Sequence, residues 1–249
     1  TVAGGISNVS SGNRSSIGGG QNNRAIGYGS GTFSGRYNAT CADDAFVGAG
    51  YANRASGNQS SVVGGIVNCA TGNCSFVGGG CNNRAVSNFS VVSGGVTNTA
   101  SSAYSAVVGG DNNSANAARA FIGGGYNSTV SAAYGSVVGG YQNVATYMGA
   151  VGGGRGNTTS ANYATISGGQ SNAASGTVST VSGGNANTAS GYRSSIGGGQ
   201  ANTASEACSR VGGGCGNTAS GCSSLVAGGI GNVSTGTATV VGGGQANSA

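Results

Sequence analysis

The chain has 249 residues, of which 55 are Gly, and it contains no Pro, Trp or His. Only 5% of the residues are charged: the nine basic residues are all Arg, four residues are acidic, and the net charge is +5. This composition is far from that of an average globular domain, and the missing Pro and the absence of a three-residue glycine period exclude collagen. No apolar run is long enough to span a bilayer, so we expect no membrane insertion by this segment.

A fifteen-residue repeat runs through the whole chain. Its origin is an Asn, replaced once by Ser128, and the step shortens once to fourteen residues around Tyr147-Met148-Gly149. The seventeen origins are Asn8, Asn23, Asn38, Asn53, Asn68, Asn83, Asn98, Asn113, Ser128, Asn143, Asn157, Asn172, Asn187, Asn202, Asn217, Asn232 and Asn247.

Other positions of the repeat are equally strict. Gly stands three residues before every origin, Val or Ile stands six before it except at Thr32, and a small residue or Val130 follows two after it. A disordered Gly-Ser linker has no reason to keep such a register. The repeat therefore predicts an all-β fold, a parallel β-solenoid (β-roll) of about seventeen 15-residue coils stacked on one another. We expect residues 1–249 to form one continuous solenoid, a fragment of a longer repeat chain.

One coil illustrates the expected elements in chain order. Residues 194–198 alternate between Ser, Ile and Gly at every second place, which predicts a short strand with those side chains facing inward. The following glycines supply the positive φ that a tight corner needs. A second short strand is expected through Asn202 and Ala204. We expect the inward Asn to form a ladder that satisfies backbone groups at the corner, coil after coil.

Units such as Ala189–Glu206, reading ASGYRSSIGGGQANTASE, resemble the head-domain repeats of trimeric autotransporter adhesins and the related repeats of microbial and viral surface fibres. The resemblance covers the whole chain. It implies a left-handed parallel β-roll, side-by-side association of three chains, exposure on a cell or virion surface or secretion, and attachment to a host or matrix surface or glycan. The repeats here differ from that family in their length of fifteen residues and in their seven Cys.

Enzymatic chemistry finds few groups to use, because there is no His and the four acids are scattered over the repeat. The repeated GGG is read as a turn, since no P-loop Lys follows it. Asp43 and Asp44 are adjacent and point apart on an extended chain, so no metal or cofactor is expected. Arg24, Arg54 and Arg84 share one position on alternate coils, which we interpret as a solvated face. A net charge of +5 spread over seventeen coils is too low in density to predict nucleic-acid binding.

Ten Asn-X-Ser/Thr sequons occur, a number close to what chance gives in a chain so rich in Ser and Thr. Those at origins, such as Asn38 and Asn157, should be buried. The candidate glycosylation sites are therefore those at turns, Asn13, Asn58, Asn73 and Asn88.

An alternative function comes from hydroxyls at alternate positions of the second strand. They resemble the threonine rows of ice-binding β-solenoids, although Thr and Ser also simply suit an exposed strand. The residues of this array are Thr99, Ser101, Thr129, Ser131, Thr158, Ser160, Thr188, Ser190, Thr203, Ser205, Thr218 and Ser220.

Residues seven apart often match chemically, either by chance or because they meet between subunits around a three-fold axis. Cys74 precedes Cys81, and Cys208 precedes Cys215. Seven extended residues span roughly 23 Å, too far for a disulfide within one chain. We therefore predict a parallel homotrimer closed by Cys74–Cys81 and Cys208–Cys215 disulfides between subunits, with Cys222 as a competing partner of Cys208. Cys41 and Cys69 receive no partner.

The strand facing the three-fold axis would carry outward apolar side chains. These residues are Phe33, Phe46, Val63, Phe76, Val91, Val108, Phe121 and Val138.

Overall fold

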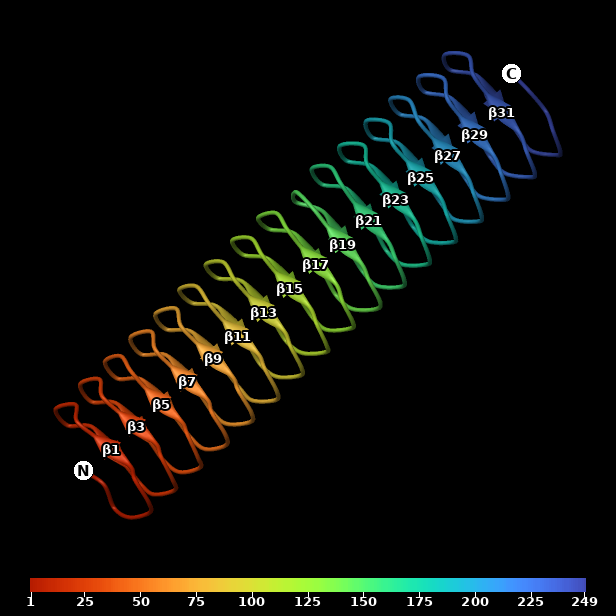
Figure 1. Cartoon of the computed structure of the whole chain (residues 1–249). Helices are drawn as coiled ribbons and strands as arrows, with labels where there is room; N and C mark the ends of the chain where they lie inside the picture. The colour runs from red at the N-terminus through yellow and green to blue at the C-terminus, as the bar shows by residue number, and fades with distance from the viewer. The chain divides into compact units, whose positions relative to one another are not determined.

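The computed structural model describes all residues from Thr1 to Ala249 and confirms the predicted fold class: the chain is an all-β parallel solenoid without helices (Figure 1). It consists of two compact units, Thr1–Asn127 and Ser128–Ala249, and each is described here by itself. No helix of the length and hydrophobicity needed to cross a bilayer is present.

In the first unit each coil contributes one odd-numbered and one even-numbered strand, and each set pairs in parallel within its own sheet. The odd-numbered strands are β1 (Val9–Ser10), β3 (Arg24–Ala25), β5 (Ala39–Thr40), β7 (Arg54–Ala55), β9 (Cys69–Ala70), β11 (Arg84–Ala85), β13 (Thr99–Ala100) and β15 (Ser114–Ala115). The even-numbered strands are β2 (Ser16–Ile17), β4 (Gly31–Thr32), β6 (Phe46–Val47), β8 (Ser61–Val62), β10 (Phe76–Val77), β12 (Val91–Val92), β14 (Ala106–Val107) and β16 (Phe121–Ile122).

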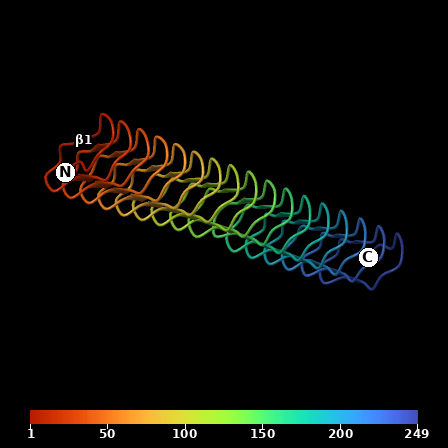
Figure 2. The same ribbon diagram turned by 90° about the horizontal axis from the view of Figure 1, so that it is seen from below.

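The second unit repeats this arrangement, and the stacking of coils within each unit can be followed from below in Figure 2. Its odd-numbered strands are β17 (Thr129–Val130), β19 (Val144–Ala145), β21 (Thr158–Thr159), β23 (Ala173–Ala174), β25 (Thr188–Ala189), β27 (Thr203–Ala204), β29 (Thr218–Ala219) and β31 (Val233–Ser234). Its even-numbered strands are β18 (Ser136–Val137), β20 (Ala150–Val151), β22 (Thr165–Ile166), β24 (Thr180–Val181), β26 (Ser195–Ile196), β28 (Arg210–Val211), β30 (Leu225–Val226) and β32 (Val240–Val241).

The strand register follows the repeat. Val62 pairs with Val77, fifteen residues later, and across the shortened repeat Val137 pairs with Val151, fourteen residues later. Each unit has eight coils with a strand pair, so the structure contains sixteen complete coils where the sequence contains seventeen repeats. The difference lies at the chain ends, where Val2 and Ser248 make only isolated bridges.

The strands are shorter than predicted, two residues each, and two corners complete each coil. In the coil around Asn98, the segment 93–98 joins β12 to β13, and the segment 101–105 joins β13 to β14. We call the equivalents of these segments the glycine corner and the turn corner. The deleted residue is absorbed at a turn corner, where the amide of Gly149 donates to the carbonyl of Thr146. The deletion thus leaves both sheets in register.

The interior is thin and is filled by one large and one small side chain per coil. Val or Ile of the even-numbered strands faces Ala of the odd-numbered strands, and Val92 and Ala100 are fully buried. Beside Val130 and Thr159, which replace the usual Ala, a turn-corner position that is usually Ser is Gly. A Cβ at Gly135 would lie 2.8 Å from Cγ1 of Val130, and a Cβ at Gly149 would overlap the hydroxyl of Thr159. At these two places the larger side chain is thus compensated by a smaller one beside it.

Candidate functional surfaces

A ladder of buried Asn side chains fixes the geometry of every exposed position. Nδ2 of Asn98 donates to the carbonyls of Gly94 at 3.0 Å and Gly110 at 2.7 Å, and its Oδ1 accepts from the amide of Asn113 at 3.0 Å. Each Asn therefore satisfies backbone groups of its own coil and of the next one. The predicted ladder is confirmed. At Ser128 the hydroxyl replaces the amide oxygen as acceptor for Asn143, at a longer 3.3 Å.

The glycine three residues before each origin cannot be another residue. Gly95 has a φ of +90°, a conformation that side chains disfavour. A Cβ there would also overlap the carbonyl oxygen of Gly110 in the next coil. The neighbouring Gly94 has no atom within 4 Å of a Cβ position. In this coil Gly95 is therefore required to be Gly, whereas the position of Gly94 has room for a side chain.

Both corners present side chains from strained, outward-pointing backbone. Residues such as Val67 and Tyr104 have positive φ although they are not glycine. At the turn corner, the rings of Phe89 and Tyr104 stack with centroids 4.9 Å apart, and the Arg119 guanidinium lies 5.5 Å from the centroid of Tyr104. These contacts along the stack join residues of adjacent coils, and fifteen-residue spacing of aromatic and Arg residues was the signal that could have predicted them.

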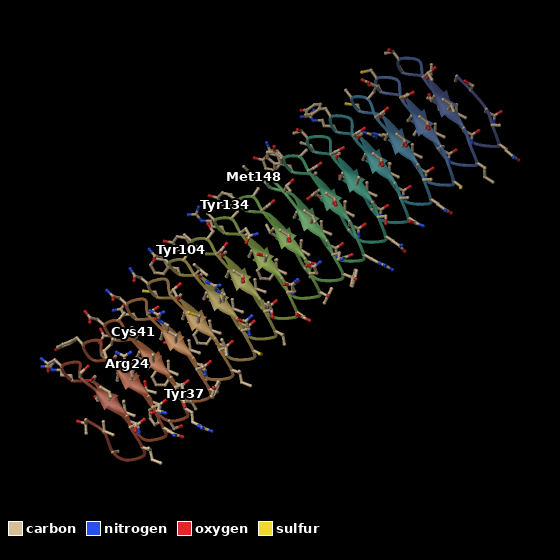
Figure 3. The ribbon with its side chains drawn as sticks, in the orientation of Figure 1. Arg24, Tyr37, Cys41, Tyr104, Tyr134 and Met148 are labelled. Carbon is tan, nitrogen blue, oxygen red and sulfur yellow. The ribbon has the colours of Figure 1, made fainter.

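The glycine corner carries similar contacts. Tyr37 and Tyr51 meet edge to face with centroids 5.7 Å apart, and Arg155 lies 5.2 Å from the ring centroid of Tyr141. Figure 3 shows Tyr37 and Tyr104 at opposite corners, on either side of the odd-numbered strands. The Tyr side chains therefore lie at both corners of the coils and do not converge on one site.

The seven cysteines are all free thiols in the single chain. Cys74 and Cys208 lie at turn corners, whereas Cys81 and Cys215 lie at glycine corners, so the predicted disulfides have no partners within one subunit and remain predictions. The intrachain alternative between Cys208 and Cys222 is not formed, and Sγ of Cys222 lies 4.0 Å from the hydroxyl of Ser223.

Cys41 and Cys69 lie on the odd-numbered strands' side, two coils apart. The coil spacing of about 4.8 Å separates them by roughly 9.6 Å along the stack, beyond the reach of a disulfide. Burial raises the pKa of the Cys69 thiol above its ordinary value, although the positive charges of Arg54 and Arg84 act in the opposite direction. Cys69 is thus a protonated thiol at neutral pH, poorly suited as a nucleophile.

The predicted Thr/Ser array lies on the outer face of the odd-numbered strands. In the second unit, Thr188, Thr203 and Thr218 occupy consecutive, directly paired positions. Ala173 separates Thr158 from this run. In the first unit, Ser101 donates a hydrogen bond to Asn116, so that hydroxyl is already engaged. The structure therefore brings together only part of the array as an uninterrupted row.

The candidate glycosylation residues Asn13, Asn58, Asn73 and Asn88 are all exposed at turn corners. Oδ1 of Asn73 accepts from the amide of Asn58, and Oδ1 of Asn88 accepts from the amide of Asn73. The amide nitrogen, which glycosylation modifies, makes no hydrogen bond in Asn73 or Asn88. The origin residues Asn38, Asn157 and Asn232 are fully buried, as predicted for sequons at these positions.

No group of three or more His, Cys, Asp or Glu side chains is arranged to hold a metal ion. No protein-family model matches the chain, and no curated protein matches it either. The parallel solenoid is compatible with a β-roll repeat, and the particular repeat type rests on the sequence resemblance alone. Function must therefore be argued from the surfaces of the coils.

Proposed function

We propose that this chain is a structural segment of an extracellular adhesive fibre, displayed on a cell or virion surface or secreted, which holds its shape and presents side chains for attachment. The observation that carries the proposal is the apolar outer face of the even-numbered strands in the first unit. Phe33 is 69% exposed, Val63 50% and Val108 49%. A contiguous apolar face of this kind marks an association surface.

The apolar face has a regular relief. In the first unit, each coil after that of β2 carries one large residue in one of two columns: Phe46 and Phe76 are each followed two residues later by Gly, whereas Val63 and Val108 lie two residues after a small residue. The large residues change column from coil to coil except at Phe76 and Val91, which pair in the same column. The rings of Phe33 and Phe46 meet edge to face, with their centroids 6.1 Å apart. They border a hollow of about 320 Å³ beside Gly31. This relief favours packing against copies with the same coil spacing, and we propose a parallel homotrimer.

The cysteine positions support this arrangement. In each predicted pair one thiol lies at a turn corner and the other at a glycine corner, on opposite edges of the strand layer that would face the three-fold axis. Head-to-tail contacts of two different edges close after three subunits. Disulfides Cys74–Cys81 and Cys208–Cys215 would then link the trimer at two levels, in an oxidising compartment.

Oligomeric state tests the assembly. Sedimentation equilibrium should give three times the 23.2 kDa chain mass, and denaturing electrophoresis without reductant should show a trimer that reduction converts to monomer. Replacing Phe46 and Phe76 with Ser should dissociate the reduced trimer, whereas Val9→Ser, at an exposed apolar position of β1 on the opposite sheet, should not. A wild-type chain that is monomeric in both assays would refute the assembly.

Adhesion is tested separately. Latex beads coated with the chain should bind collagen-coated or glycan-coated surfaces more than beads coated with albumin do. If trimeric chain and albumin give equal binding, the adhesive role is wrong even though the assembly stands.

The paired Thr row of the second unit favours a second candidate, ice binding. Thr188, Thr203 and Thr218 repeat along the stack at the coil spacing of about 4.8 Å, a regular array of hydroxyl and methyl groups. A measurable thermal hysteresis that Thr203→Lys abolishes would support this candidate. Ice growth unaffected by the wild-type chain would exclude it.

A further inference from the structure

We propose that the outer face of the odd-numbered strands in the first unit binds an extended acidic polysaccharide through Arg24, Arg54 and Arg84. These three residues lie in β3, β7 and β11, at the same position of alternate coils. The inference names a ligand class for the proposed adhesive function and rests on it. It does not depend on the trimer, because it uses the sheet opposite the apolar face.

The three guanidinium groups form a straight, regular row. Arg54 pairs with Cys69, which pairs with Arg84, and Ala39 separates Arg24 from Arg54 in the same way. Two coils of about 4.8 Å place successive arginines roughly 9.6 Å apart. That interval is close to the Debye length at physiological salt, so the row accumulates charge without strong mutual repulsion.

The row has charge available for an external anion. All three side chains are exposed, and none makes an ion pair, a hydrogen bond or a ring contact within the chain. The acidic residues of the unit lie elsewhere: Asp43 and Asp44 are at a turn corner and Asp111 is at a glycine corner. Oδ1 of Asp43 is occupied as the acceptor for the amide of Tyr28. No carboxylate on this face competes for the arginines.

The surroundings of the row allow a ribbon-like ligand to lie flat. Ala39 and Cys69 between the arginines are half-buried, and the adjacent column carries only Ile26, Cys41, Ser56, Thr71 and Val86. In Figure 3 Arg24 and Cys41 lie on this face, away from the tyrosines at the corners. The result is a shallow strip with one cation on every second coil.

An acidic polysaccharide fits this strip better than a nucleic acid does. Arg binds carboxylate and sulfate groups through two parallel hydrogen bonds, and a linear polysaccharide with one acidic group per disaccharide has a spacing comparable to two coils. Single-stranded nucleic acid is held by aromatic side chains on which bases stack, and this face carries no aromatic residue. Its phosphates are also far more closely spaced than these arginines.

The test measures binding of heparin, a linear sulfated polysaccharide, to the full chain as a function of salt. With three contacts, the logarithm of the binding constant should fall with the logarithm of salt with a slope of about −2. Replacing Arg24, Arg54 and Arg84 together with Gln should weaken binding at least about tenfold and flatten the slope. The same three residues changed to Lys should retain most of the binding, because the charge is kept.

The matched control replaces Arg155, Arg193 and Arg210 of the second unit with Gln, which removes the same charge from other surfaces. It should leave heparin binding nearly unchanged. Equal losses in the two Gln variants would overturn the proposal, since net charge alone would then explain binding. Tighter binding to a single-stranded oligonucleotide than to heparin, or equal binding to uncharged dextran, would also overturn it.

Circular dichroism should show the same β signal for both Gln variants, because every position changed is on the surface. If the chain adheres to surfaces as proposed but heparin does not bind, only the ligand assignment is wrong. If neither occurs, the adhesive function itself fails.

Discussion

Replacing Asn98 with Asp changes one buried amide group into a carboxyl of the same shape, and so tests what the Asn ladder contributes. Asn98 is fully buried. Its Nδ2 donates to two carbonyls, those of Gly94 and Gly110, and a carboxylate has no hydrogen to donate. The carboxylate oxygen can still accept from the amide of Asn113. The substitution therefore removes two hydrogen bonds and keeps one.

The magnitude follows from these groups. The carbonyl of Gly94 is left without a donor, which costs about 1–3 kcal/mol, and the buried charge adds to this cost. The carbonyl of Gly110 loses one of its two hydrogen bonds but still accepts from the amide of Val96 at 2.9 Å. A domain typically has a free energy of unfolding of 5–15 kcal/mol, so this loss is large. Asn98→Ser is the matched control, since Ser128 shows that a hydroxyl can serve as the ladder's acceptor. It loses both amide donors but introduces no charge.

The two variants should differ in their dependence on pH. Burial raises the pKa of the introduced carboxyl in the folded state above its unfolded value of about 3.9. Stability is therefore greatest below the unfolded pKa and is lost as pH rises through the folded pKa. Below that pH the protonated carboxyl can again donate to one carbonyl. Asn98→Ser has no such group and should show no matching change.

Urea unfolding followed by circular dichroism at pH 4 and pH 8 measures the difference. Hydrogen exchange should show the loss of protection centred on the coils next to residue 98, because each coil contacts only its neighbours. The reasoning is refuted if Asn98→Asp costs less than about 1 kcal/mol at pH 8. It is also refuted if the gap between the two variants is the same at both pH values.

Three further substitutions give separate checks by urea unfolding. Gly95→Ala should lower the free energy of unfolding by more than about 3 kcal/mol, because residue 95 has positive φ and the added Cβ would overlap a carbonyl oxygen. Gly94→Ala should change it little, because nothing lies within 4 Å of the added Cβ. Similar effects at the two sites would contradict the corner geometry. Ser194→Ala should raise the free energy of unfolding by about 1 kcal/mol, since the buried Ser194 hydroxyl has no hydrogen-bond partner. Ser90→Ala should lower it, because the Ser90 hydroxyl donates to the carbonyl of Ser87 at 2.6 Å. A change of the same sign in both variants would be evidence against this account. Val67→Asn should raise the free energy of unfolding by about 1 kcal/mol, since Asn tolerates the positive φ of this residue better than a β-branched residue does. A lower free energy of unfolding would show instead that packing of the Val67 side chain stabilises the fold.

The repeat determined the fold class because a solenoid has a single architectural variable, the number of residues per coil. A step of fifteen between Asn83 and Asn98 is also the step between strands that pair, so the register could be read directly from the letters. The inward Asn and the required Gly were predictable for the same reason. Each recurs because the same backbone groups of every coil need it.

The length of the strands and the contacts between side chains of adjacent coils could not be predicted from the repeat. The alternation of side chains predicted longer strands, but each strand has two residues, because residues with positive φ at both corners end the extended backbone. The stacking of Phe89 on Tyr104 depends on how two corner side chains orient over a neighbouring coil. Repeat spacing places such residues side by side but does not fix the direction of their rings.

By itself, the sequence determined which residues face inward, which recur at corners and which lie in the same column, since all three follow from the period. The tertiary structure decided which of those neighbours interact. It showed that Cys41 and Cys69 are too far apart to join, and that Gly149 is small because Thr159 fills the space opposite. It also showed that the arginines of one face have no acidic partner. The physical reason is that periodicity fixes position along and around the stack, whereas contacts depend on side-chain direction and on the atoms of adjacent coils.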